Sequence, residues 1–137
     1  MSKRFLLFFF SFSCVLVVFT SLRLPQEDSE MTLLMRKMAD EMKNVKASTL
    51  SDKFYTDWVV DYKLITVAAP STEAKKGPKF DEYSKIFLAQ VDRFRSNKEV
   101  SQIRPQYNLL ISGCIQCHET FCPGPLSMLR KLKVPEN

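Results

Sequence analysis

Residues 103–121 constrain the fold of this chain more than any other stretch, because apolar side chains recur along it with helical spacing. Successive members are separated by 4, 3, 4, 3 and 4 residues, which is the seam by which one helix packs along another. Stretches 31–45, 54–65 and 80–94 have similar apolar stripes, and no stretch alternates as a strand does. We therefore predict an all-α fold, an antiparallel four-helix bundle. The seam consists of Ile103, Tyr107, Leu110, Cys114, Cys117 and Phe121.

The ends of the predicted helices follow from the polar residues, prolines and glycines between the stripes. Residues 24–30 form a polar lead-in with acids suited to a helix N-terminus, and Ser51 is suited to cap a second helix. The stretch 68–78 is predicted to be a linker. Pro123-Gly124-Pro125 must end the fourth helix, which leaves 126–137 as a short basic tail of one or two turns. The second helix is predicted to bury Phe54, Trp58, Tyr62 and Ile65.

Residues 1–22 differ in composition from the rest, with no acid, two bases (Lys3 and Arg4) and six of the 11 Phe. Bases followed by an apolar run are the layout of a secretory signal peptide. The run is also close to the ~20 residues that span a bilayer, so an N-terminal membrane anchor through residues 5–22 is an alternative. A third alternative is a lipoprotein in which a lipid is attached to Cys14. Each alternative predicts that residues 23–137, the bundle domain, are exported to the periplasm.

Cys114-Ile115-Gln116-Cys117-His118 is a C-x-x-C-H motif, and its histidine is the only one in the chain. Two cysteines at this spacing share one face of a helical turn, where both thiols can form thioethers with one haem. The adjacent imidazole then approaches the iron as the proximal ligand. Because only 19 residues follow His118, we expect the three preceding helices to cover the porphyrin. The motif predicts one covalent haem c, held by Cys114, Cys117 and His118.

Two interpretations of the motif without haem stay open. Cys122 adds a fourth potential zinc ligand to the three residues of the motif, although structural zinc sites usually draw ligand pairs from separate segments. Alternatively, the C-x-x-C pair is a thiol-redox site, but no βαβ pattern surrounds it. If neither applies, Cys122 is a free thiol in an oxidising compartment.

A C-x-x-C-H motif on the last helix, with an aromatic residue three positions after the histidine, resembles the class II c-type cytochromes. These are cytochrome c′ and its six-coordinate relatives. The resemblance is specific at residues 114–121 (CIQCHETF) and extends in layout over residues 31–121. It implies an exported four-helix bundle with haem on the last helix, and by analogy a homodimer. The family often has a basic residue after the aromatic, where this chain has Cys122 and then Pro-Gly-Pro.

The resemblance also implies that a residue on the first helix faces the distal side of the iron. Met35-x-x-Met38 fits the family's pattern, which makes Met35 the predicted sixth ligand and Met38 the second choice. A methionine ligand implies an electron-transfer protein that works with redox partner proteins. An apolar residue instead implies a five-coordinate module that binds NO or CO. The same methionines would also serve as adaptable core side chains.

Composition narrows the remaining function classes. Removal of residues 1–22, with two bases and no acids, lowers the net charge from +5 to +3, and no bases interleaved with aromatics indicate nucleic-acid binding. Neither a Ser/His/Asp set nor paired carboxylates are visible for acid–base or nucleophilic catalysis. We therefore predict that the protein is not an enzyme, and that it contacts membranes only through an uncleaved N-terminal segment.

Overall fold

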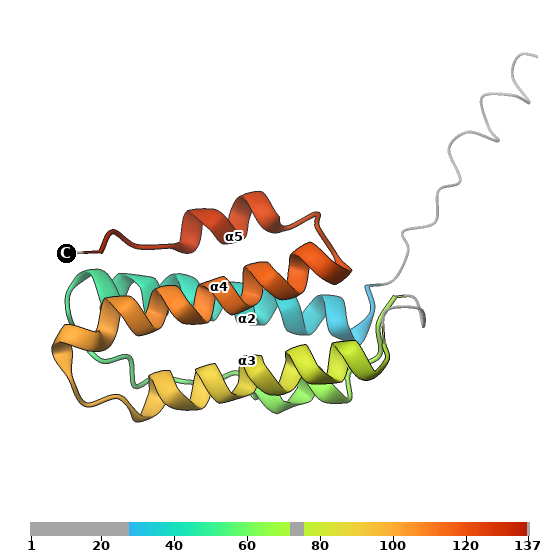
Figure 1. Ribbon diagram of the computed structural model, residues 1–137, viewed down its shortest axis with the longest axis horizontal. Coiled ribbons are helices and arrows are strands. Elements are labelled where there is room, and N and C mark those ends of the chain that lie inside the picture. The colour runs from blue at the N-terminus through green and yellow to red at the C-terminus, as the bar shows by residue number, and fades with distance from the viewer. Residues whose placement is uncertain (1–27, 72–75, 137) are drawn as a thin grey trace, which may run out of the picture.

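The computed structural model describes residues 28–71 and 76–136, which form an all-helical bundle (Figure 1). No strand occurs in either range, so the predicted helical fold is confirmed for this part of the chain. The predicted signal peptide or anchor, with Cys14, lies outside the described residues. The elements are α2 (Glu30–Leu50), η1 (Tyr62–Thr66), α3 (Pro78–Ser96), η3 (Val100–Gln102), α4 (Ile103–Phe121) and α5 (Leu126–Leu132), where η marks a 3-10 helix.

Three helices form where the apolar stripes predict them. Helix α2 begins after Ser29, whose hydroxyl accepts the N–H of Thr32 at 3.2 Å, as an N-cap does. Helix α3 begins with Pro78, because proline fits the first turn of a helix. Helix α4 spans the whole predicted seam. None of these three helices, nor any other in the two described ranges, is long and apolar enough to cross a bilayer.

The predicted second helix is wrong, because residues 53–61 are not helical and only the short η1 turn follows them. Ser51 ends α2 instead of beginning a new helix. Asp52 has a φ of 52°, and its N–H and that of Lys53 bond to carbonyls in the last turn of α2 at 3.1 and 3.0 Å. These two bonds form a Schellman motif, and its left-handed residue turns the chain away from a helical path.

A buried carboxylate holds the non-helical segment 53–61 against α2. Glu41 of α2 is only 3% exposed, and its Oε1 accepts the N–H groups of Val59 (2.6 Å) and Val60 (3.2 Å). Its Oε2 accepts the hydroxyl of Tyr62 at 2.6 Å. Backbone N–H groups removed from water need an acceptor, and here a side chain supplies what helical carbonyls would otherwise provide. The conformation of the segment therefore depends on a residue that is distant in sequence.

The irregular backbone still directs three of the four predicted core side chains inward. Tyr62 and Ile65 are buried, and Trp58 is half-buried with its ring 6.1 Å from that of Phe94 in α3. Phe54 is 42% exposed, so its predicted burial is wrong. The stripe at 54–65 thus indicates a packing surface correctly, although the backbone that presents it is not a helix.

The fourth helix of the bundle is α5, in the residues predicted to be a basic tail. Leu129 and Leu132 bury their side chains, and Figure 1 shows α5 lying along α4 and α2. After α5, the backbone of Val134 pairs with Asn108 of α4. The Asn108 amide donates to the Val134 carbonyl at 2.9 Å and accepts the Val134 N–H at 3.0 Å. This reciprocal pair is buried, so it fixes how the end of the chain docks on α4.

Helices α3 and α4 run antiparallel with large rings in contact at both ends. The ring centroids of Phe94 and Tyr107 are 6.1 Å apart at one end, and those of Phe80 and Phe121 are 5.4 Å apart at the other. Between these ends, Gln90 of α3 lies against Gly113 of α4. If residue 113 had a side chain, its Cβ atom would lie only 2.0 Å from the amide oxygen of Gln90. The glycine therefore lets the Gln90 side chain rest on the backbone just before the C-x-x-C-H motif.

Replacement of Asn108 by alanine should lower the free energy of unfolding of the full chain by about 2 kcal/mol, because it leaves a buried N–H and a buried carbonyl of Val134 without partners. Urea unfolding followed by circular dichroism measures the change. Gln116→Ala, at an exposed position of the same helix, is the control and should shift stability by less than about 0.5 kcal/mol. Equal effects of the two substitutions would contradict the docking role of Asn108.

Candidate functional site

The C-x-x-C-H motif occupies the last two turns of α4, at the end of the bundle where α2 begins (Figure 1). Cys114 packs against the hydrophobic core, and burial raises the pKa of its thiol to about 12. Cys117 lies one turn further along the helix and is partly buried. Burial also raises the pKa of Cys117, and a charge on Cys122 would raise it further. Both thiols are therefore neutral at ordinary pH, and Cys114 packs against the core.

His118 is oriented by a backbone carbonyl. Its Nδ1 lies 3.0 Å from the carbonyl oxygen of Cys122. A carbonyl only accepts, so Nδ1 must bear the hydrogen, and Nε2 keeps its lone pair. Burial lowers the pKa of the ring, which favours this neutral form. An imidazole that donates from one nitrogen to a carbonyl and offers the other to a metal is the usual arrangement of a histidine ligand.

The Pro-Gly-Pro sequence explains why that carbonyl is available. Cys122 is the C-cap of α4, and its own N–H bonds to the His118 carbonyl at 3.0 Å. In a continuing helix the Cys122 carbonyl would accept the N–H of Leu126. That N–H bonds instead to the carbonyl of Pro123 at 3.1 Å, in the turn that leads into α5. The end of α4 therefore leaves the Cys122 carbonyl to His118.

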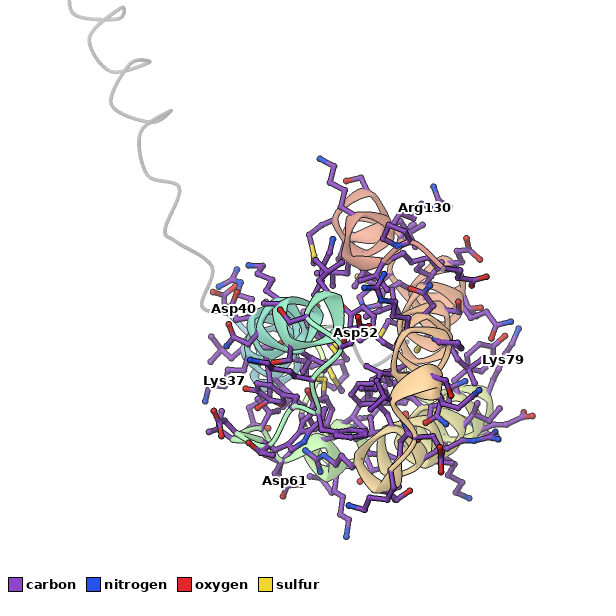
Figure 2. The ribbon with its side chains drawn as sticks, turned by 90° about the vertical axis from the view of Figure 1, so that its left-hand side faces the viewer. Lys37, Asp40, Asp52, Asp61, Lys79 and Arg130 are labelled. Atoms are coloured by element: carbon purple, nitrogen blue, oxygen red, sulfur yellow. The ribbon has the colours of Figure 1, made fainter. Side chains whose placement is uncertain are left out.

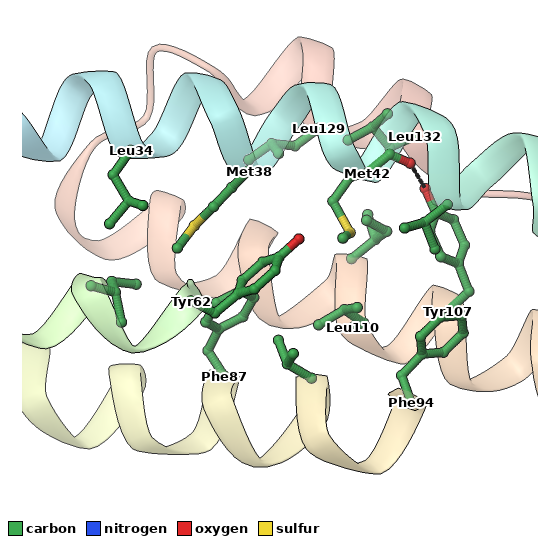
Figure 3. Packing of buried hydrophobic residues seen from close by; sticks show 14 of the residues in the cluster. Leu34, Met38, Met42, Tyr62, Phe87, Phe94, Tyr107, Leu110, Leu129 and Leu132 are labelled. Carbon is green, nitrogen blue, oxygen red and sulfur yellow. Dashed lines mark hydrogen bonds between the residues drawn. The ribbon is translucent and has the colours of Figure 1, made fainter. Parts of the chain in front are cut away.

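The pairing of α2 with α4 places His118 beside the first turns of α2. The Tyr107 hydroxyl donates to the Met42 carbonyl at 3.1 Å (Figure 3), and Arg104 donates to the Leu50 carbonyl at 3.3 Å. His118 lies eleven residues beyond Tyr107 and fourteen beyond Arg104. Because the helices are antiparallel and rise equally per residue, His118 is level with residues 31–36 of α2.

The two predicted distal ligands differ in depth. Met35 lies within the level of His118 and is partly buried against the core. Met38 is 6% exposed, and its side chain extends from α2 toward Tyr62 in the interior (Figure 3). The position along α2 therefore favours Met35, whereas the deeper burial of its side chain favours Met38. The identity of the sixth ligand stays a prediction. Two partly buried thiols, one imidazole and a thioether are donor types that fit a six-coordinate c-type haem.

The four potential zinc ligands, Cys114, Cys117, His118 and Cys122, do not form a metal-binding group in the part of the chain that the structure describes. Cys114, Cys117 and Cys122 are free cysteines. Within residues 28–71 and 76–136, no three His, Cys, Asp or Glu side chains form a group that could hold a metal ion. The zinc and thiol-redox interpretations of the motif stay predictions.

Two features of the site were missed by sequence reasoning. The Cys122 carbonyl was not expected as the partner of His118, although proline directly after Cys122 was a signal that α4 ends there. The hydrogen bond between Glu41 and Tyr62 was also missed, because a buried acid on α2 looks like an ordinary solvated position in the sequence. No protein-family model, curated protein or solved structure matches this chain.

Cys114 should resist alkylation in the folded, haem-free protein. A pKa near 12, against 9.0 for an unburied thiol, lowers the thiolate fraction at pH 8 by about a thousandfold, and the thiolate is the reacting form. Peptide mass spectrometry after timed exposure to iodoacetamide measures the rate for each cysteine. The rate at Cys114 should rise about tenfold per pH unit while the fold persists. Equal rates at Cys114 in buffer and in urea would contradict this.

Proposed function

We propose that this chain is an exported mono-haem c-type cytochrome that transfers electrons. In this proposal Cys114 and Cys117 hold the haem through thioethers, and His118 is the proximal ligand. The observation that carries the proposal is the 3.0 Å contact between His118 Nδ1 and the Cys122 carbonyl. It supports the proposal because it selects the tautomer with a free Nε2 and fixes the plane of the ring, in the one motif whose spacing suits a haem.

A bound haem supplies a one-electron couple at its iron, and the chain's own residues determine its setting. Cys114 and Cys117, one turn apart on α4, would fix the group against that helix at two points. The hydrogen bond to the Cys122 carbonyl orients the imidazole ring of His118. Core side chains pack against Cys114, so this side of the group would be partly shielded from water.

Room for a porphyrin would come from the methionines of α2. Methionine is unbranched and has three rotatable bonds, so it adapts to a flat group at low cost. Met38 and Met42 are buried opposite α4, and Met31 and Met35 pack at the edge of the same core. Met31, Met35 and Met38, which are nearer the level of the motif than Met42, would therefore form an adaptable wall beside it.

Met35 is the proposed sixth ligand, with Met38 as the second choice. A sulfur ligand would close the iron to small gases and leave outer-sphere electron transfer with redox partner proteins of the periplasm. Residues 1–22 would direct the chain there, as a cleaved signal or as an anchor. If neither methionine ligates, the alternative function is a five-coordinate haem that binds NO or CO. A homodimer is part of either proposal by analogy with the resembled family.

The test is expression of the full chain with a cytochrome c maturation system. A pyridine haemochrome spectrum and the mass of the purified chain report whether one haem is attached through two thioethers. The visible spectrum of the reduced protein, with and without carbon monoxide, separates the two functions. A low-spin spectrum that carbon monoxide leaves unchanged supports the electron carrier. A colourless protein that contains zinc would overturn the proposal.

Met35→Ala should convert the reduced haem from low spin to high spin and make it bind carbon monoxide, because the iron loses its sulfur ligand. Met38→Ala tests the second choice, and Met128→Ala on α5 is the control that should change neither property. Absorption spectra with carbon monoxide titration give the result. Conversion by Met38→Ala alone would reassign the ligand, and a high-spin unmodified protein would favour gas binding.

A further inference from the structure

Two buried tyrosines lie in the interior of the bundle, Tyr62 from η1 and Tyr107 from α4 (Figure 3). Tyr62 is 2% exposed and Tyr107 is fully buried. Burial raises the pKa of both phenols, and a negative charge on Cys114 would raise both further. Neither tyrosine has a role in haem attachment or iron ligation. They are therefore two comparable buried phenols in the same core.

The hydrogen-bond partners of the two phenols differ in chemistry. Tyr62 donates to the Glu41 carboxylate at 2.6 Å, whereas Tyr107 donates to the backbone carbonyl of Met42 at 3.1 Å. A carboxylate can take up a proton, and a peptide carbonyl cannot do so near neutral pH. The two oxygens of Glu41 also have separate tasks. Oε1 accepts the N–H groups of Val59 and Val60, and among the described residues the Tyr62 phenol is the partner of Oε2.

We propose that Tyr62 is a proton-coupled electron donor inside the bundle, with Glu41 as its proton acceptor. One electron leaves the phenol ring, the phenolic O–H bond breaks, and the proton passes to Oε2 of Glu41. The products are a neutral tyrosyl radical and a neutral carboxylic acid. The oxidant is a one-electron acceptor of high potential, such as a ruthenium(III) polypyridyl complex. The placement of this donor beside a redox centre rests on the proposed haem, whereas the donor and its base do not.

The charge balance of the interior favours this step at Tyr62 over Tyr107. Before oxidation, the Tyr62 site contains one buried negative charge on Glu41, and after it the site contains none. Removal of a buried charge lowers the desolvation cost. Because the proton lands on Oε2, the bonds from Val59 and Val60 to Oε1 survive. At Tyr107 the same oxidation would leave a positive charge buried against a carbonyl.

A nearby cation confines the radical to Tyr62. The ring of Trp58 lies 6.0 Å from that of Tyr62, close enough to exchange an electron with it. The Arg95 guanidinium sits over Trp58 at 4.3 Å from the ring centroid, and over Tyr62 at 5.1 Å. Its positive charge opposes a radical cation on the indole. The Trp58 N–H donates to the Tyr55 carbonyl at 3.0 Å, which cannot accept the proton.

The experiment uses the matured, oxidised full chain and a photogenerated ruthenium(III) polypyridyl oxidant. Electron paramagnetic resonance of samples frozen after the flash detects tyrosyl radicals. Tyr62→Phe keeps the ring and its packing, and should abolish the radical signal. The matched control Tyr107→Phe should leave the signal unchanged. A signal lost in Tyr107→Phe, or equal losses in both variants, would overturn the proposal.

Two further variants test the base and the cation. Glu41→Gln should slow radical formation by about a hundredfold, because it removes the proton acceptor and keeps the shape. Circular dichroism establishes that this variant is folded. Arg95→Gln should shift part of the signal to a tryptophan radical, and this result tests the same proposal if Glu41→Gln does not fold. An unchanged rate in folded Glu41→Gln, or a tyrosyl signal unaltered in Arg95→Gln, would contradict the assigned roles.

Failure of the haem proposal and failure of this inference give different results. A pyridine haemochrome on the same samples reports the haem independently of the radical. If the chain carries no haem after expression with the maturation system, the proposed function is overturned, and a Tyr62 radical in that protein would still support the donor pair. Attached haem without a Tyr62 radical would overturn the donor pair and leave the proposed function in place.

Discussion

The interior face of α4 is the surface on which the rest of the described structure depends. Ile103, Tyr107, Leu110 and Ile111 are each 1% exposed or less, and α2, α3 and α5 all contact this helix. Burial of that much apolar surface is the main source of stability in a chain of this size. Because the C-x-x-C-H motif continues the same seam, the packing that folds the bundle also sets how deeply the motif sits.

The end of α4 couples helix termination to the chemistry of the motif. A helix that stops leaves carbonyl groups without intrahelical partners. Here the stop at Pro123 falls directly after Cys122, and the carbonyl of Cys122 is satisfied by the His118 ring at 3.0 Å. One break in the backbone therefore ends the helix, starts the turn into α5 and selects the tautomer of the only histidine. The departure from the resembled family at this position has a structural consequence of its own.

Glu41, a buried carboxylate of α2, stabilises a segment that is not helical. Glu41 accepts the N–H groups of Val59 and Val60 and the Tyr62 hydroxyl, so these two backbone groups have an acceptor without a helix. A carboxylate satisfied by three donors rigidifies the site that contains it. The same contact gives Tyr62 a proton acceptor that Tyr107 lacks. Structure and proposed chemistry thus share one side chain.

The sequence by itself determined the helices whose signals are local. The stripes and end signals of α2, α3 and α4 predict these helices within a few residues, because helical periodicity and capping act over one or two turns. The spacing of Cys114, Cys117 and His118 is likewise a local property, so their common location on one helix end was predictable. The partner of His118 follows from the local end of α4, four residues away, whereas only the tertiary structure decided the path of residues 53–61 and the docking of α5. Each depends on an acceptor or donor brought from elsewhere by folding, as Glu41 is for Val59 and Asn108 is for Val134. Long-range hydrogen bonds of this kind leave no periodic trace in a sequence, because either partner alone is an ordinary polar residue or backbone group.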